Sequence, residues 1–315
     1  MKILVLGSKG LAGSNILKYL ETSSHLTFGL SRQDVDLLNE NDVIEKFIKI
    51  KPDVVIGAAS KVGGMMANSK YPAEFLLENL RIQNNMISAA YKSNIEKLIF
   101  FGSSCIYPAN SPQPIKEEYL LTNVLEKTNE AYAIAKIAGL KLVEAFVSEY
   151  GRKWFSIMPT NLYGPGDNFD LENSHVLAAV IRKFYDAKNN GNDNVQFWGT
   201  GKPRREFMHI SDFASAVVYL MENYHETSLI NVGTGEDISI LELVEKVAEI
   251  SKFTGEIIWD KSKPDGTFQK KLDVSKLNSI GWKPKITLDK GLQSTYSWFA
   301  ENYKSARLKV PILKF

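Results

Sequence analysis

The sequence has few of the features that mark secreted, membrane or nucleic-acid-binding proteins. It contains one cysteine, Cys105, in 315 residues, so no disulfide can form within the chain, which favours a reducing compartment. The net charge is only +2, and no basic tract or acidic tail is present. No apolar run approaches the roughly 18 residues that a membrane span needs. We therefore expect a cytoplasmic protein that binds neither nucleic acid nor membrane and whose partner is a small molecule.

The first half of the chain alternates short apolar runs with longer amphipathic segments. Met1-Lys2 leads directly into the apolar run Ile3–Leu6, so we expect no signal peptide. Strands are expected at residues 3–6, 26–30, 53–57, 97–101 and 154–158, and helices at 14–21, 41–50, 72–91 and 130–150. This alternation predicts an α/β fold, namely a Rossmann-type doubly wound parallel sheet with helices on both faces.

The second half is less regular. Helices are expected over residues 176–187, 212–224, 238–250 and 288–303, with a short strand over 229–232. No low-complexity linker separates the halves, which indicates a smaller α/β domain interleaved with the first. We predict one domain from residues 1–166 with 207–232 and a second from 167–206 with 233–315.

A glycine-rich turn follows the first predicted strand and leads into the first predicted helix. Its sequence is Gly7-Ser8-Lys9-Gly10-Leu11-Ala12-Gly13, with the spacing G-x-x-G-x-x-G. Glycines here permit a tight turn and close backbone approach to a pyrophosphate at the N-terminus of the helix. Three glycines can also form a simple turn, but the strand before and the helix after favour dinucleotide binding.

The second predicted strand ends next to Arg32. A site specific for NAD usually has an acidic residue here for the ribose 2′-hydroxyl, whereas Arg32 suits a 2′-phosphate. Lys9 adds a second positive charge, and Asp34 and Asp36 come slightly later, beside the adenine or at the next helix cap. NADPH is thus favoured over NADH, the alternative being that Arg32 is an ordinary solvated charge.

A hydroxyl, a phenol and an amine form the candidate catalytic group. Tyr132 and Lys136 are four residues apart on a predicted helix and share one face. We expect the Lys136 ammonium to lower the pKa of the Tyr132 phenol, which makes it a proton donor near neutral pH. Ser103 follows an apolar run, and Cys105 lies two residues further on. Such a set suits chemistry at and beside a ketone.

Longer segments extend this pattern over nearly the whole chain, from Met1 to about Tyr303. Together they resemble the extended short-chain dehydrogenase/reductases that act on nucleotide sugars, and among them the GDP-L-fucose synthases, which are GDP-4-keto-6-deoxymannose 3,5-epimerase/4-reductases. The segments are 61–64, 102–108, 130–136, 158–165, 173–176 and 263–267.

The resemblance implies two steps on a GDP-linked 4-keto sugar. In epimerisation at C3 and C5, Cys105 is the implied base and His175 the implied acid. Taken without the family, Cys105 suits a small buried apolar residue and His175 a hydrogen bond within its loop. In the second step, Ser103 and Tyr132 bind the C4 oxygen, Tyr132 donates a proton, and Lys136 holds the nicotinamide ribose.

The resemblance also implies binding residues and an assembly. NADPH is the implied cofactor, held by the glycine turn and Arg32, with Asn161, Leu162 and His175 beside the nicotinamide. The GDP-sugar positions are Lys183, Trp198, Arg205 and Asp265. Relatives pair through the helices that begin near Pro72 and Glu130, which implies a homodimer. No spacing of His, Cys and Asp indicates a metal site.

Three alternatives stay open. A close relative could reduce a GDP-4-keto-heptose at C4 without epimerising it. A protein with this fold could instead sense NADP without catalysis, although we expect such a protein to lack Ser103, Tyr132 or Lys136. A 4-epimerase that retains NAD is disfavoured by Arg32 and by the pair Cys105 and His175.

Overall fold

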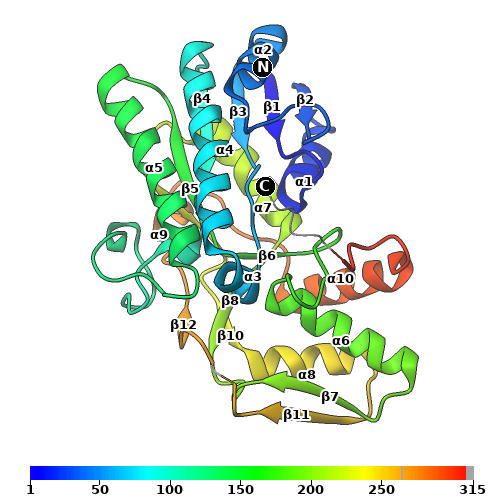
Figure 1. Cartoon of the computed structure of the whole chain (residues 1–315). Helices are drawn as coiled ribbons and strands as arrows, with labels where there is room; N and C mark the ends of the chain where they lie inside the picture. The colour runs from blue at the N-terminus through cyan, green and yellow to red at the C-terminus, as the bar shows by residue number, and fades with distance from the viewer. Residues whose placement is uncertain (264, 310–315) are drawn as a thin grey trace.

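A computed structural model of the chain describes residues 1–263 and 265–309. Its largest sheet has six parallel strands in the order β2-β1-β3-β4-β5-β9 (Figure 1). The strands are β1 (Lys2–Leu6), β2 (Leu26–Leu30), β3 (Val54–Gly57), β4 (Lys97–Phe101), β5 (Phe155–Pro159) and β9 (Ile230–Val232). Because β2 lies on one side of β1 and β3 on the other, the strand order reverses at β1. Ligands of such sheets bind at this reversal, beyond the carboxyl ends of the strands.

Helices cover both faces of the sheet because consecutive strand residues point to opposite sides. In β1, Leu4 and Leu6 belong to one hydrophobic cluster, which includes side chains of α2, α4 and α5. Ile3 and Val5 belong to a second cluster, which includes side chains of α1 and α7. The helices of this part are α1 (Leu11–Leu20), α2 (Glu40–Ile50), α3 (Met65–Lys70), α4 (Pro72–Lys92), α5 (Glu130–Tyr150) and α7 (Ile210–Asn223).

Most of the remaining strands and helices form a smaller part, which lies below the parallel sheet in Figure 1. Its strand β8 pairs antiparallel with β10 and parallel with β12 and β6, and a separate parallel pair joins β7 and β11. A third hydrophobic cluster joins α6, α8 and α10. Its elements are β6 (Asn161–Tyr163), β7 (Asn194–Trp198), β8 (Arg204–His209), β10 (Asp237–Ser239), β11 (Glu256–Asp260), β12 (Gln269–Lys270), α6 (Val176–Asn190), α8 (Ile240–Ser251) and α10 (Leu288–Asn302). Helix α9 (Ser275–Ser279) and the 3₁₀ turns η1 (Ser104–Ile106) and η2 (Glu117–Tyr119) lie instead beside the parallel sheet, where Leu277 of α9 belongs to the second cluster.

The predicted α/β fold class is confirmed, and every helix and strand expected in the first half is present within a few residues. Of the strands β6 to β12, only β9 was expected. The strands β6, β10 and β12 have two or three residues, too few for a recognisable periodicity. The longer strands β7, β8 and β11 were missed as well. The proposed division into two domains stays a prediction, and its positions 264 and 310–315 lie outside the described residues.

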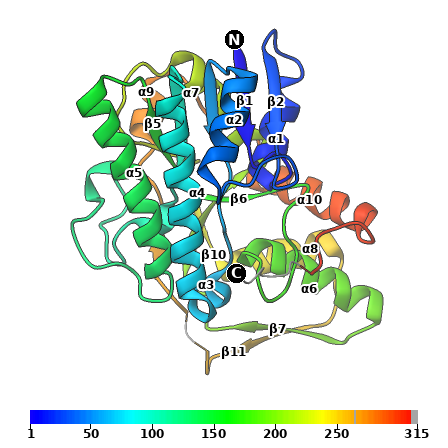
Figure 2. The ribbon, with the colours of Figure 1, turned by 45° about the horizontal axis from the view of Figure 1, so that its top comes forward.

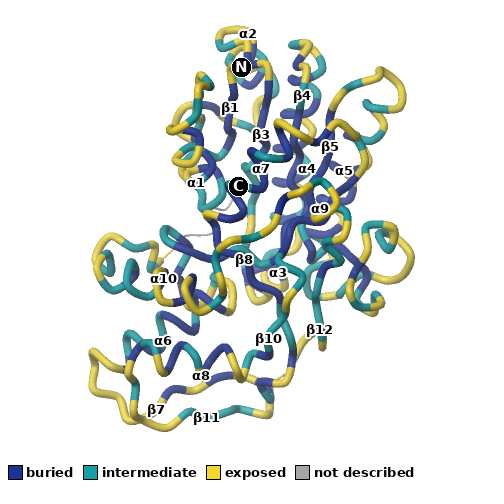
Figure 3. The backbone as a smooth tube through the Cα atoms, turned by 180° about the vertical axis from the view of Figure 1, so that it is seen from behind, coloured by how far each residue is buried: buried dark blue, intermediate teal, exposed yellow. Residues whose placement is uncertain are grey.

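Burial follows the same arrangement. In the parallel sheet, β1, β3, β4, β5 and β9 are largely buried, whereas the edge strand β2, the loops and the outer helix faces are intermediate to exposed (Figure 3). No helix among the described residues is long and apolar enough to span a membrane.

Candidate functional site

The glycine turn has the backbone that a pyrophosphate cradle requires. Gly7 has φ +81°, a conformation that favours glycine, and its carbonyl oxygen accepts a hydrogen bond from Gly10 N–H at 2.9 Å. A Cβ on Gly13 would lie 2.3 Å from that same oxygen, so only glycine fits there. Helix α1 begins at Leu11, within this glycine-rich segment and directly after its N-cap Gly10. The N-terminal N–H groups of the helix are therefore available to an anion.

Positive charge gathers at the end of β2, next to this turn. The Lys9 ammonium donates to Gln33 Oε1, and the Arg32 guanidinium pairs with Glu78 at 2.8 Å while 61% of its side chain stays exposed. Asp34 accepts from the N–H and the hydroxyl of Ser31 at 2.9 and 2.6 Å, so this carboxylate stabilises the turn after the strand. The exposed charges of Lys9 and Arg32 fit a dinucleotide with a 2′-phosphate, although the Asp34 carboxylate beside them is exposed as well.

Ser103, Cys105 and Tyr132 come together beyond the end of β4. The Ser103 hydroxyl accepts from the Cys105 N–H at 3.2 Å, which caps η1. Tyr132 lies in the first turn of α5, where its phenol hydrogen-bonds Ser103 and is close enough to Cys105 for their charges to interact. A proton donor, a second hydroxyl and a thiol therefore line one position.

The pKa values of Tyr132 and Lys136 differ from those expected from the sequence. Burial and the nearby Cys105 raise the pKa of the Tyr132 phenol above 10.0, and the hydrogen bond with Ser103 only partly opposes this. Lys136 lies with its ammonium 4.8 Å from the centre of the Phe100 ring, and burial lowers its pKa to about 7. The prediction that Lys136 lowers the pKa of Tyr132 is thus wrong for the chain alone. The reason is that the amine is as strongly desolvated as the phenol and loses much of its own charge near neutral pH.

His175 lies on another segment of the chain, at the N-cap of α6. Its side chain is exposed, but the surrounding protein displaces part of its water and lowers the pKa of the imidazole. The loop after β3 contacts the residues just before His175, since the Gly64 N–H donates to the Asn173 carbonyl oxygen at 3.0 Å. This hydrogen bond therefore helps to hold the start of α6.

Asn161 and Leu162 lie in β6, directly after β5. Asn161 Nδ2 donates to the carbonyl oxygen of Glu206 at 2.8 Å, and Leu162 packs against the second hydrophobic cluster. Both therefore connect the parallel sheet to β8, whichever ligand they contact.

The four positions expected to hold a GDP-sugar lie on β8, on α6, at the end of β7 and in the segment between β11 and β12. Arg205 lies in β8, near enough to Cys105 for their charges to interact, while burial lowers the pKa of its guanidinium. Lys183 donates to Gln196 O at 2.7 Å, and Trp198, at the end of β7, is 49% exposed. Asp265 accepts from the N–H and the hydroxyl of Thr200 at 2.7 and 2.8 Å, so it braces the loop after β7.

Two residues that sequence reasoning missed hold this site in place. Asn129, at the N-cap of α5, donates to the Cys105 carbonyl oxygen at 3.2 Å and so joins the cysteine loop to the helix of Tyr132. Its position directly before Glu130, the first residue of α5, is typical of an N-cap, although its side chain makes no capping hydrogen bond. Glu206, fully buried, accepts from the N–H groups of Thr234, Gly235 and Leu272. No local pattern marks such a residue.

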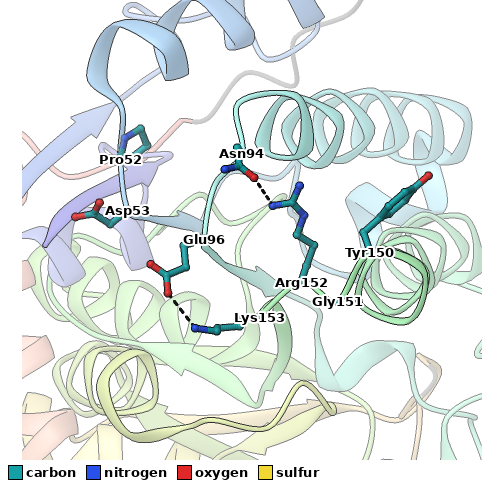
Figure 4. Close-up of a pocket in the computed structure, with 8 residues that line it drawn as sticks. All are labelled: Pro52, Asp53, Asn94, Glu96, Tyr150, Gly151, Arg152 and Lys153. Carbon is teal, nitrogen blue, oxygen red and sulfur yellow. Dashed lines mark hydrogen bonds and ion pairs between the residues drawn. The ribbon is translucent and has the colours of Figure 1, made fainter.

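A surface hollow of about 470 Å³ lies away from this site (Figure 4). It is lined by residues that precede β3, β4 and β5, at the edge of the sheet opposite Ser103. Its charged groups have partners: Glu96 with Lys153 at 3.2 Å and Arg152 with Asn94 at 2.7 Å. We therefore assign it no part in the chemistry. Among the described residues, no group of three or more His, Cys, Asp or Glu could hold a metal ion.

Comparison with known proteins identifies the family. The NAD dependent epimerase/dehydratase family matches residues 3–233. The chain belongs to this family.

Within the family, the chain is similar over its whole length to proteins named for GDP-sugars. GDP-L-fucose synthase 1 of Arabidopsis thaliana is 50% identical over 302 residues, which cover 96% of this chain and 94% of the relative. A solved GDP-L-fucose synthetase from Naegleria fowleri, bound to NADP, is 31% identical with a TM-score of 0.90, covering 97% of this chain and 94% of that one. A solved GDP-6-OMe-4-keto-L-xylo-heptose reductase from C. jejuni is 36% identical with a TM-score of 0.90, covering 96% and 98%.

Proposed function

We propose that this chain is an NADPH-dependent enzyme that reduces the 4-keto group of a GDP-4-keto-6-deoxy sugar after epimerising C3 and C5. The observation that carries the proposal is the convergence of Ser103, Cys105 and Tyr132 at one position. The 50% identity to a GDP-L-fucose synthase over 96% of this chain supports the choice of sugar.

Epimerisation needs a base, an acid and a site for negative charge. The C–H bonds at C3 and C5 are acidic because the neighbouring ketone accepts charge as an enolate. Cys105 is the base and His175, on the separate segment at the start of α6, is the acid. Ser103 and Tyr132 donate hydrogen bonds to the enolate oxygen and stabilise its charge.

Reduction uses the same oxygen. NADPH, when bound, supplies the hydride that reduces C4. Tyr132 then donates its proton to the nascent alkoxide, for which a buried, protonated phenol is suited. Lys136 binds the nicotinamide ribose. Its pKa of about 7 allows either protonation state near neutral pH, so an anion placed beside it favours the charged ammonium. One oxyanion site thus serves both steps.

We assign the binding residues as the resemblance implies, and the geometry of the glycine turn and of Arg32 supports the cofactor part of this assignment. The turn Gly7-Ser8-Lys9-Gly10-Leu11-Ala12-Gly13 holds the pyrophosphate, Arg32 and Lys9 hold the 2′-phosphate, and Asn161 and Leu162 lie beside the nicotinamide. Lys183, Trp198, Arg205 and Asp265 hold the GDP-sugar. The domains of residues 1–166 with 207–232 and 167–206 with 233–315 bind cofactor and sugar respectively. The third hydrophobic cluster, built almost wholly from the second set, supports this division.

A second candidate is a C4 reductase of a GDP-4-keto-heptose without epimerase activity. The similarity to the C. jejuni heptose reductase, with a TM-score of 0.90, favours it. Both candidates use Ser103, Tyr132 and Lys136 in the same way, so they differ only in the sugar and in the part played by Cys105 and His175.

The test is a reaction with GDP-4-keto-6-deoxymannose and NADPH in D2O, in which NADPH absorbance and product deuterium are followed together. Oxidation with deuterium at C3 and C5, lost in Cys105→Ser, is expected. Oxidation without deuterium contradicts the epimerase step. Absence of both, with NADPH still bound, rejects the hexose, and a GDP-4-keto-heptose then tests the second candidate.

We further propose a cytoplasmic homodimer that pairs through α4 and α5. These helices lie side by side in both views (Figure 1 and Figure 2). Their outer faces expose Leu77 and Ile134, which are 43% and 45% accessible. A single cysteine in 315 residues is consistent with a reducing compartment.

A further inference from the structure

Glu78 lies between two cations on the cofactor side of the sheet. It belongs to α4, and only 6% of its side chain is exposed. One carboxylate oxygen accepts from Arg32 Nη2 at 2.8 Å, and the other accepts from Lys61 Nζ, also at 2.8 Å. Each oxygen therefore has its own charge-assisted hydrogen bond.

The two cations differ in their surroundings. The Lys61 side chain is only 10% exposed and also pairs with Glu74 at 3.1 Å, which anchors it within the protein. Arg32 is 61% exposed, and one edge of its guanidinium is fixed by Glu78. The planar guanidinium has five donors, so a carboxylate on one edge leaves donors on the others for a second anion.

We propose that Glu78 is the positioning residue that holds Arg32 ready for a 2′-phosphate and thereby sets the preference for NADPH over NADH. The proposal rests on the function proposed above. An unrestrained exposed arginine loses considerable side-chain entropy when a ligand immobilises it, whereas an arginine already held loses less. The carboxylate also repels a phosphate, but Lys61 faces it directly and offsets its charge.

These two effects of Glu78 have opposite signs, so one variant separates them. If positioning dominates, Glu78→Gln weakens binding of a 2′-phosphate, because a neutral amide holds the guanidinium less firmly. If repulsion dominates, the same variant binds the phosphate more tightly.

The experiment is calorimetric titration of the whole protein with adenosine 2′,5′-diphosphate and with 5′-AMP, which differ only in the 2′-phosphate. For Glu78→Gln we expect about fivefold weaker binding of the diphosphate and unchanged binding of 5′-AMP, since one charge-assisted contact is lost. Tighter binding of the diphosphate overturns the proposal. So does equal weakening of both ligands, which indicates a general structural defect.

Two control variants assign the effect. Glu74→Gln removes a second carboxylate partner of Lys61 and leaves the Glu78 contact to Arg32 in place, so it should leave both affinities unchanged. In an Arg32→Ala background, Glu78→Gln should have no further effect on the diphosphate; an undiminished effect overturns the proposal. If Arg32→Ala leaves the ratio of the affinities for adenosine 2′,5′-diphosphate and 5′-AMP unchanged, the assignment of Arg32 to the 2′-phosphate is wrong.

A variant that keeps Glu78 covers the case in which Glu78→Gln fails to fold. Arg32→Lys retains the charge but presents a single ammonium instead of a fork, so it cannot hold Glu78 and a phosphate in the same planar way. We expect it to lose diphosphate binding selectively, again by about fivefold. Unchanged selectivity in Arg32→Lys contradicts the proposal.

Discussion

Gly64 and Asn173 are joined by a hydrogen bond from N–H to carbonyl oxygen of 3.0 Å, although 109 residues separate them in the chain. A Cβ on Gly64 would lie 2.5 Å from the carbonyl oxygen of Ser174, the residue before His175. The Nδ2 of Asn68 donates to the carbonyl oxygens of Gly63 and Gly64 and fixes this loop from behind. The place of His175 thus depends on the absence of a side chain at position 64.

The first prediction concerns this contact. Gly64→Ala should force the segment of Ser174 to move and carry His175 with it, which slows deuterium exchange at the sugar by about 100-fold, because displacements near 1 Å have effects of that size. Exchange is measured by mass spectrometry of the recovered GDP-sugar. Met65→Ala, at an exposed neighbouring position, is the matched control and should exchange at the wild-type rate. Normal exchange in Gly64→Ala would show that His175 tolerates the shift.

Lys136 should reduce the stability of the ligand-free protein. Burial lowers its pKa to about 7, so between pH 7 and 10.5 the unfolded chain binds more protons than the folded one, and stability rises with pH in that window. Lys136→Met should therefore be more stable than the wild type by about 1–3 kcal/mol at pH 7, less than the full shift because Met packs imperfectly. It should also lose reductase activity.

Denaturant unfolding at several pH values tests this prediction. The stability advantage of Lys136→Met should shrink as the pH is raised from 7 toward 10.5, where the cost of burying the charged amine disappears. A variant that is less stable at pH 7, or whose advantage grows with pH, contradicts it.

Glu206, in β8, should stabilise the contacts of this strand with the backbone of residues 234–235 and 272. Its buried carboxylate accepts from three backbone N–H groups, at 2.6 Å from Thr234, 2.9 Å from Gly235 and 2.7 Å from Leu272. Glu206→Ala leaves these donors without an acceptor and should cost about 3 kcal/mol in the free energy of unfolding. Urea denaturation measures the loss. Glu236→Ala, at an exposed position of the same loop, should cost little; equal losses for the two variants would refute the assignment.

The last prediction tests the dimer. Ile134→Glu combined with Leu77→Glu places two charges on the outer faces of α5 and α4 and should convert the dimer to a monomer, since unpaired charges are strongly disfavoured in an apolar interface. Light scattering coupled to gel filtration reads the mass. Ile48→Glu, at an exposed position on α2, is the control and should leave the mass unchanged. A wild-type protein that elutes as a monomer rejects the proposal outright.

The candidate site could be predicted from the sequence where its residues are close in the chain. Ser103 and Cys105 share one short turn, and Tyr132 and Lys136 share one helix face, so local spacing alone grouped them. The electrostatics could not be predicted in this way. The pKa of Tyr132 is raised because the phenol is buried, and burial depends on segments that spacing does not reveal.

By itself the sequence determined the parallel sheet, the glycine turn after β1, and the grouping of Ser103 with Cys105 and of Tyr132 with Lys136. These follow from periodicities of two and 3.6 residues and from the conformational freedom of glycine, all of which act within a few residues. Only the tertiary structure decided that Glu78 pairs with Arg32, that Gly64 supports the segment before His175, and that Asn129 holds the Cys105 loop. Such contacts join distant parts of the chain, and their distances and burial exist only once the helices have packed on the sheet.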